Sequence, residues 1–456
     1  VFDEVRYFQP GREMFLLQMG EALIGPTVCE DIWQPGPPAT DLALAGALVI
    51  ANISASPFHV GKGLEREEML ITRARDNACW VALVNAVGGQ DELIFDGHSV
   101  VIDEEGEVVA RAPSFEEALL LVDIDVTTAI ARRLVDARRR SLASEREIPN
   151  PPVIHLGEPR TQDGPVKPYV AEPLDELEQM RRALELGLSD YVEKNGFEEI
   201  VIGVSGGIDS ALTAALAVEA LRPDRVHCVS MPSRFSSEET RRDAERLAET
   251  LGTSFLEIPI DPIFESFAKA LAPVFGDRET DITEENLQAR IRGTLLMALS
   301  NKFGWLVVAT GNKSELSVGY STLYGDMAGG FALLKDVFKT DVFRLARHLN
   351  ARAGRELIPE SIVERAPSAE LRAGQKDEDS LPPYAALDKV LEAYVEEDRS
   401  HEELTTDGFD QDVVDRAIAL IDRAEYKRRQ APPGVKLRPK AFGRDRRTPI
   451  TNRWRG

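Results

Sequence analysis

The feature that most constrains the fold is a glycine-rich turn between an apolar run and a helical pattern. The turn reads Ser205-Gly206-Gly207-Ile208-Asp209-Ser210. The run from Ile200 to Val204 predicts a buried strand, and residues 211–221 predict a helix. Glycines allow the chain to turn tightly and to approach a ligand closely. Loop amides at a helix N-terminus form an anion site, so the pattern predicts a phosphate-binding loop.

This loop differs from the commonest phosphate loop, because the GxxxxGK[ST] pattern is absent. Asp209 would repel a phosphate directly, but it suits a Mg²⁺ ion that bridges carboxylate and phosphate oxygens. The alternative is a strand-to-helix turn that binds nothing. The setting between a strand and a helix favours the functional interpretation.

The rest of the second half repeats the alternation of strand and helix. Further strands are predicted over 226–230, 255–260 and 306–309, and helices over 236–251 and 284–303. Ser236 and Glu239 form a capping-box pattern at the start of the first of these helices. The alternation predicts a doubly wound parallel sheet, which binds ligands at the carboxyl ends of its strands.

The first 145 residues predict a second α/β domain with some antiparallel pairing. Strands are expected over 47–53 and 80–85, a helix over 64–78, and a hairpin formed by 98–102 and 107–110. Residues 146–173 are rich in proline and predict a linker. We therefore expect domains at 1–145 and 174–456. Because the sequence begins with Val-Phe-Asp and not with Met, we also expect a missing N-terminal segment.

Composition narrows the possible functions. The net charge of -23 disfavours nucleic-acid binding as the main role. No apolar run is long enough to span a bilayer, and no signal-peptide pattern is present. Cys29, Cys79 and Cys228 form no CxxC pair, which indicates a reducing, cytoplasmic setting without disulfides or zinc.

The SGGxDS turn resembles the pyrophosphate loop of the ATP pyrophosphatase superfamily. Three further stretches resemble one branch of it, the glutamine-dependent NAD synthetases: Ala309-Thr310-Gly311-Asn312-Lys313-Ser314-Glu315, Tyr320 to Met327 and Lys335 to Thr340. Residues 284–290, 425–428 and 432–434 also match, so the resemblance covers nearly all of 174–456. It implies a carbon–nitrogen ligase that uses ATP and Mg²⁺ to adenylate deamido-NAD and then amidate it to NAD.

The resemblance also implies residue roles. The expected ATP contacts are Gly203, Val204, Ser205, Gly206, Gly207, Ile208, Asp209, Ser210, Thr310 and Lys339. The expected deamido-NAD contacts are Asn286, Glu315, Asp326 and Lys427, and the expected Mg²⁺ ligands are Asp209 and Glu315. Each residue taken alone has a plain structural explanation, such as a solvated helix position for Asn286.

The front domain resembles the nitrilase-type glutaminase domain that is fused to these synthetases, an α-β-β-α sandwich. The matches are residues 1–8, Cys29-Glu30-Asp31-Ile32-Trp33 and residues 52–57. The resemblance implies that Cys29 is the glutaminase nucleophile and that Ser56 and Lys62 contact glutamine. The family's base Glu and catalytic Lys lie upstream of residue 1, so we expect the chain as printed not to hydrolyse glutamine. We also expect the first domain to lack part of its sandwich, which would leave sheet surface exposed.

We thus expect a cytoplasmic enzyme of NAD biosynthesis whose partners are deamido-NAD, ATP and glutamine or ammonia, assembled as a homo-oligomer. Two alternatives stay open. The first is an ammonia-only synthetase with an inert front domain. The second is a non-catalytic nucleotide-binding scaffold, which would bind ATP without releasing pyrophosphate. Another amidotransferase or a plain nitrilase-type hydrolase fits the two halves less well.

Overall fold

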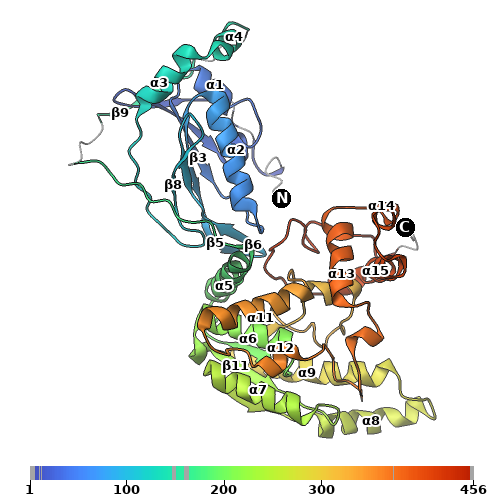
Figure 1. Cartoon of the computed structure of the whole chain (residues 1–456). Coiled ribbons are helices and arrows are strands. Elements are labelled where there is room, and N and C mark those ends of the chain that lie inside the picture. Colours follow the sequence, from blue (N-terminus) through green and yellow to red (C-terminus); the bar gives the residue numbers. More distant parts are fainter. Residues whose placement is uncertain are drawn as a thin grey trace. The chain divides into compact units, whose positions relative to one another are not determined.

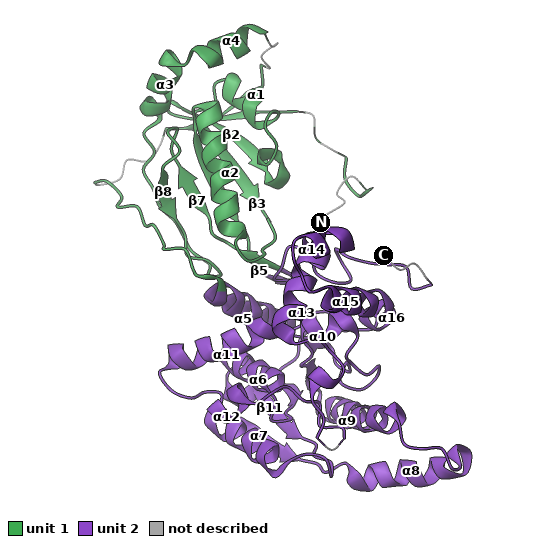
Figure 2. Ribbon diagram, turned by 45° about the vertical axis from the view of Figure 1, so that its right-hand side comes forward, with its two compact units in different colours: residues 1–88, 94–176 green, residues 89–93, 177–456 purple. Residues whose placement is uncertain are grey.

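The computed structural model describes residues 6–9, 11, 13–145, 150–158, 164–372 and 374–451. The chain forms two compact units, one of residues 1–88 and 94–176 and the other of residues 89–93 and 177–456 (Figure 2).

The first unit is built on a seven-stranded sheet with the order β8-β7-β4-β3-β2-β1-β9 (Figure 1). Its strands are β1 (Leu16–Met19), β2 (Ala22–Val28), β3 (Val49–Ser54), β4 (Trp80–Asn85), β7 (Val100–Ile102), β8 (Val108–Arg111) and β9 (Val153–Gly157). The three central strands β2, β3 and β4 run parallel, whereas β4, β7 and β8 pair antiparallel. The mixture of parallel and antiparallel pairing confirms the expected α/β layout with a hairpin at the edge.

Helices α1 (Ala39–Leu44) and α2 (Lys62–Asn77) cover one face of this sheet, and α3 (Val126–Val135) and α4 (Ala137–Glu145) follow the last antiparallel strand. Ala129 of α3 packs with Val49 and Trp80 in a second cluster on the other face. Leu42 of α1 and Leu70 of α2 join Ile50 and Leu83 of the sheet in one buried cluster. Strands β5 (Val87–Gln90) and β6 (Leu93–Asp96) form a separate hairpin whose tip, residues 89–93, belongs to the second unit.

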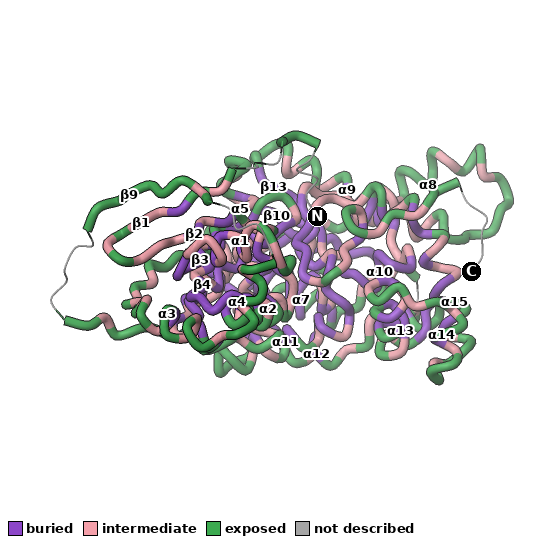
Figure 3. The backbone as a smooth tube through the Cα atoms, turned by 90° about the horizontal axis from the view of Figure 1, so that it is seen from above, coloured by how far each residue is buried: buried purple, intermediate pink, exposed green. Residues whose placement is uncertain are grey.

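One element of the first unit was not predicted. The proline-rich segment was expected to be a linker, yet it contributes β9, which pairs in parallel with β1. All five residues of β9 are exposed (Figure 3). The strand therefore shows no alternation of apolar and polar positions, and that alternation is the signal by which a strand is predicted.

The second unit has a five-stranded parallel sheet with the order β12-β11-β10-β13-β14. The strands are β10 (Ile200–Gly203), β11 (Val226–Ser230), β12 (Ser254–Glu257), β13 (Leu306–Ala309) and β14 (Phe331–Ala332). The chain adds β11 and β12 on one side of β10 and then β13 and β14 on the other. This reversal at β10 is the switch point at which such sheets open a ligand crevice.

The helices of the second unit surround this sheet and extend beyond it (Figure 1). They are α5 (Glu176–Lys194), α6 (Ile208–Leu221), α7 (Glu238–Leu251), α8 (Asp261–Phe275), α9 (Ile282–Phe303), α10 (Lys313–Val318), α11 (Lys339–Ala353), α12 (Glu360–Glu364), α13 (Tyr384–Leu391), α14 (His401–Thr406), α15 (Gln411–Arg423) and α16 (Glu425–Arg428). The helices α13 to α15 share an apolar cluster with Val318 of α10, which includes Leu387, Leu391, Val414 and Ile418.

Most predicted boundaries agree with the structure to within a few residues. The start of α7 differs, because Ser237 and not Ser236 is the N-cap residue, and its hydroxyl accepts a hydrogen bond from the Thr240 amide. Helix α6 begins at Ile208, three residues before the predicted start. Asp209 and Ser210 therefore lie in its first turn.

Candidate active site

A cavity of about 420 Å³ opens at the carboxyl ends of β10, β11 and β13 in the second unit. Its lining includes every residue that the resemblance assigned to ATP or deamido-NAD: Gly203, Val204, Ser205, Gly206, Gly207, Ile208, Asp209, Ser210, Asn286, Thr310, Glu315, Asp326, Lys339 and Lys427. These residues are spread over more than 200 positions of the chain. The fold brings them to one cavity, at the switch point of the sheet.

The glycine loop has the geometry of an anion site. Gly206 has a φ of +79°, and a Cβ atom built there would lie 2.2 Å from the Thr240 carbonyl oxygen. Gly207 is the N-cap residue of α6 and provides no side-chain cap. The first amides of α6 therefore face the cavity with the partial positive charge of the helix N-terminus, as a phosphate requires.

A compact charge cluster lies beside this loop. The ammonium of Lys339 is 2.5 Å from Asp209 Oδ2 and 3.0 Å from Glu315 Oε1. The Asn312 side-chain amide donates to Asp209 Oδ1 at 2.7 Å. The cluster comes from the start of α6, the first turn of α10 and the first residue of α11.

Burial and charge pull the pKa values of this cluster in different directions. Burial raises the pKa of Glu315 to about 7, and the positive charge of Lys339 only partly offsets it. Burial alone would lower the pKa of Lys339, but the charges of Asp209 and Glu315 outweigh it and raise that pKa. Lys339 therefore stays an ammonium at neutral pH in the floor of the cavity.

The donor set of the cluster fits Mg²⁺. Asp209 and Glu315 point at one common nitrogen, so their carboxylates converge within a few ångströms of each other. Within the described ranges no three His, Cys, Asp or Glu side chains gather as a complete metal site. Two protein carboxylates completed by phosphate oxygens and water are a usual environment for Mg²⁺, which keeps part of its hydration shell.

The residues expected to hold deamido-NAD line another part of the same cavity. Asn286 Oδ1 accepts a hydrogen bond from the Thr322 hydroxyl at 2.9 Å, and Asp326 Oδ1 accepts one from the Thr322 amide at 2.6 Å. Burial raises the pKa of Asp326 to about 6. Lys427 donates to the carbonyl oxygens of Gly319 and Ser321 at 2.7 and 2.6 Å.

Two arginines of the cavity were not predicted. Arg292 of α9 donates from Nε to the Met231 carbonyl oxygen at 2.9 Å, and burial lowers the pKa of its guanidinium to about 10. Among the described residues no carboxylate lies within ion-pair distance of Arg292. Arg365 donates to the Gly206 carbonyl oxygen at 2.9 Å and pairs with Asp243. Single arginines such as these, one on α9 and one directly after α12, carry no local sequence signal that separates them from solvated residues.

In the first unit, Cys29 stands at the point where β2 ends. Its φ of +47° lies in the left-handed region, which a non-glycine residue enters only at a sharp turn. The side chain is partly accessible, and the Asn52 side-chain amide lies 3.4 Å from the Cys29 carbonyl oxygen and donates to it. A strand exit of this kind leaves the thiol partly accessible, which is a requirement for a nucleophile.

The two residues expected to contact glutamine, Ser56 and Lys62, lie in the same unit. The Ser56 amide donates to Asn85 Oδ1 at 2.8 Å. The Lys62 ammonium lies 4.0 Å from the centre of the Trp33 ring, four residues after Cys29. This contact brings Lys62 to the segment that carries Cys29.

The other two cysteines, Cys79 and Cys228, are buried. Burial raises the pKa of the Cys79 thiol to about 12. Burial also raises the pKa of Cys228. Neither thiol forms the reactive thiolate at neutral pH.

Comparison with known proteins identifies the family of the chain. The family model for NAD synthase matches residues 180–431, and the model for carbon-nitrogen hydrolase matches residues 1–133. A glutamine-dependent NAD(+) synthetase of Thermotoga maritima is 51% identical over 100% of this chain and 79% of its own length. The chain belongs to the glutamine-dependent NAD(+) synthetase family.

Further members support the assignment to this family. The glutamine-dependent NAD(+) synthetase of Aquifex aeolicus is 46% identical over 100% of the chain and 79% of its own length. A structure of the glutamine-dependent NAD(+) synthetase from Acinetobacter baumannii in complex with ADP superposes with a TM-score of 0.69 at 41% identity, covering 99% of this chain and 77% of that one. No helix in the described part of the chain is long and apolar enough to cross a membrane.

Proposed function

We propose that this synthetase family member makes NAD from deamido-NAD, ATP and an ammonia source, releasing AMP and pyrophosphate. The observation that carries the proposal is the single cavity that joins the glycine loop, the Asp209–Lys339–Glu315 cluster and the Asn286–Asp326–Lys427 region. A nucleoside triphosphate at the loop and a carboxylate substrate beside it would meet at that cluster.

The chemistry follows from this arrangement. The nicotinate carboxylate attacks the α-phosphorus of ATP, the bond to the β-phosphate oxygen breaks, and pyrophosphate leaves with the electron pair. The Lys339 ammonium and the α6 amides stabilise the negative charge that builds on the departing pyrophosphate. Mg²⁺, held by Asp209 and Glu315, would neutralise further phosphate charge when bound. Ammonia then attacks the acyl carbon of the adenylate, and AMP leaves.

We assign the ammonia supply to the first unit. In a protein that also carries the family's base Glu and catalytic Lys, the Cys29 sulfur would attack the amide carbon of glutamine bound near Ser56 and Lys62, release ammonia and leave an acyl-enzyme for hydrolysis. We keep the functional boundaries at 1–145 for the glutaminase domain, 146–173 for the linker and 174–456 for the synthetase domain. All three cysteines are free, which supports a cytoplasmic enzyme.

We also propose a homo-oligomer, assembled through α8 and α9. No residue of helix α8 is buried, and its apolar side chains Phe267 and Val274 are 47% and 79% exposed. Met297 and Phe303 of α9 are 39% and 57% exposed. An apolar surface of this kind is typical of a subunit interface. Sedimentation velocity should give a dimer or larger species, and Phe267→Glu should shift it to a monomer.

The first experiment measures NAD formation by the purified chain with ATP, Mg²⁺ and deamido-NAD, once with ammonium and once with glutamine. Activity with ammonium supports the synthetase assignment whatever glutamine gives. Asp209→Asn should lower both activities strongly, whereas Cys29→Ala should leave the ammonium-driven rate unchanged. ATP binding without pyrophosphate release from a folded chain would instead support the scaffold alternative.

A further inference from the structure

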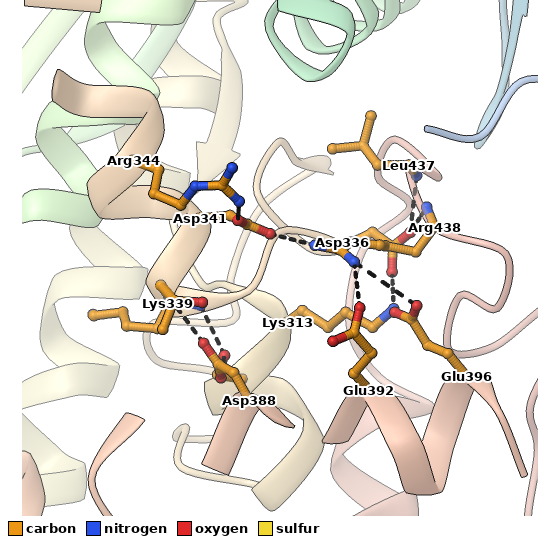
Figure 4. A network of polar contacts seen from close by, with 12 residues as sticks. Lys313, Asp336, Lys339, Asp341, Arg344, Asp388, Glu392, Glu396, Leu437 and Arg438 are labelled. Carbon is orange, nitrogen blue, oxygen red and sulfur yellow. Dashed lines mark hydrogen bonds and ion pairs between the residues drawn. The ribbon is translucent and has the colours of Figure 1, made fainter. Parts of the chain in front are cut away.

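A buried aspartate of α13 connects α10 and α11, two of the three helices that carry the reactive cluster. Asp388 Oδ1 accepts a hydrogen bond from the Ser314 hydroxyl at 2.5 Å, and Asp388 Oδ2 accepts one from the Thr340 amide at 2.9 Å. The Ser314 hydroxyl in turn accepts a hydrogen bond from the Lys339 amide at 2.8 Å. Figure 4 draws Asp388 beside Lys339 in this arrangement.

The position of these bonds in the sequence matters. Ser314 directly precedes Glu315 on α10, and Lys339 and Thr340 are the first two residues of α11. One carboxylate of α13 therefore fixes the backbone on which both Glu315 and Lys339 stand. Asp388 and Ser314 themselves are absent from the cavity lining, whereas Lys339 belongs to it.

Helix α11 also needs this carboxylate for its own N-terminus. Its N-cap residue is Phe338, which provides no side-chain cap. An acidic group that accepts from the first amides of a helix meets both the unpaired donors and the positive end of the helix dipole. Asp388 supplies that cap from another helix, and it is only 5% exposed while Ser314 is 0% exposed.

We infer that Asp388 is a positioning residue for the synthetase reaction, acting through Ser314 to hold the Lys339 ammonium between Asp209 and Glu315. The inference rests on the proposed function, because Lys339 and Glu315 have their roles there. A shift of about 1 Å in a group that stabilises charge in the transition state can lower a rate a hundredfold. Loss of the link should therefore lower kcat more than it raises KM.

The test compares Asp388→Asn with a matched substitution of another buried aspartate, Asp341→Asn. Asp341 is 3% exposed and pairs with Arg344 and Arg438, but it makes no bond to Ser314 or to the α11 amides. An asparagine at 388 cannot accept from both Ser314 and Thr340, since one of its two terminal atoms is a donor. We expect kcat with ammonium to fall by about 10- to 100-fold in Asp388→Asn, with the KM of ATP within about threefold of the wild type. Asp341→Asn should keep kcat within about threefold while losing comparable thermal stability.

A double-mutant cycle makes the test specific. Ser314→Ala removes one hydroxyl, so it reports on the link even where Asp388→Asn fails to fold. Because both substitutions break the same connection, the double variant should lose little more kcat than Asp388→Asn alone. Equal kcat losses in Asp388→Asn and Asp341→Asn, or additive losses in the cycle, would overturn the inference. A wild-type chain that folds but forms no NAD from ammonium would instead overturn the proposed function.

Discussion

Replacing Lys313 by Met should destabilise the second unit strongly at neutral pH and less at acidic pH. The Lys313 side chain is 0% exposed, and its ammonium lies 2.7 Å from both Asp336 Oδ1 and Glu396 Oε1. Met has a similar volume, so the main effect is that two carboxylates with 4% and 6% exposure lose the ammonium between them, and among the described residues Glu396 keeps only Arg438 at 4.0 Å as an ion-pair partner. Removing one partner of a buried ion pair costs about 3–5 kcal/mol in the free energy of unfolding.

The pH dependence follows from the direction of the pKa shift. Burial raises the pKa of Glu396, and the charge of Lys313 holds it down. Without Lys313 this pKa rises further above the value in the unfolded chain, so the penalty applies at high pH and is relieved as the carboxyl protonates. Each pKa unit is worth about 1.4 kcal/mol. The loss relative to wild type should therefore shrink by about 1–3 kcal/mol between pH 8 and pH 5.5.

Urea unfolding followed by circular dichroism at the two pH values measures this difference. Lys194→Met is the matched control, because Lys194 pairs with Asp190 at 2.9 Å but its side chain is 57% exposed. An exposed pair contributes less than about 1 kcal/mol, so that variant should change little at either pH. A loss in Lys313→Met below about 1 kcal/mol at pH 8, or one that does not shrink at pH 5.5, would refute the reasoning.

Two more outcomes follow from the structure. Gly206→Ala should raise the KM of ATP by at least about tenfold, because a side chain at a φ of +79° is strained and its Cβ would meet the Thr240 carbonyl oxygen. Steady-state kinetics with ammonium measure the KM, and an unchanged value would contradict the prediction. Glu67→Gln should destabilise the first unit by up to about 3 kcal/mol at pH 7 and by less at pH 3. Burial opposes ionisation of Glu67, but hydrogen bonds from His98 and Arg111 lower its pKa from 4.5 to about 2. The stabilisation by the Glu67 carboxylate is therefore full above pH 4.5 and is lost as the pH falls toward 2. Urea midpoints across that range measure the second effect, and a loss that is constant with pH would contradict it.

Local patterns predicted the elements that present the site. The glycine loop could be placed from residues 200–221 alone, because a strand, a tight turn and a helix start are each specified by neighbouring residues. The parallel sheet followed from the alternation of strands and helices. The separate residues Asn286, Asp326 and Lys427 were identified only by resemblance, since no local pattern says that they face one cavity.

Other features depend on contacts that a sequence does not display. Ser236 and Ser237 are adjacent serines, and the path of the backbone selects the second as the cap of α7. Arg292 is one of several charged residues on α9, and only its bond to the Met231 carbonyl and its place in the cavity lining distinguish it. Asp388 lies 74 residues after Ser314, so its link could appear only once the helices had been packed.

The tip of the β5/β6 hairpin affects the order in which the two units can fold during synthesis. Gly89 binds Asp190 and Lys194, and Glu92 pairs with Lys335, which lies 243 residues later in the chain. During synthesis residues 89–93 are made before the rest of the unit to which they belong. Their bonds to that unit can form only after most of the chain has been made. The second unit is thus discontinuous, and a single cut in the proline-rich segment cannot release it whole: a fragment from residue 177 onward would have to fold without Lys335 meeting Glu92.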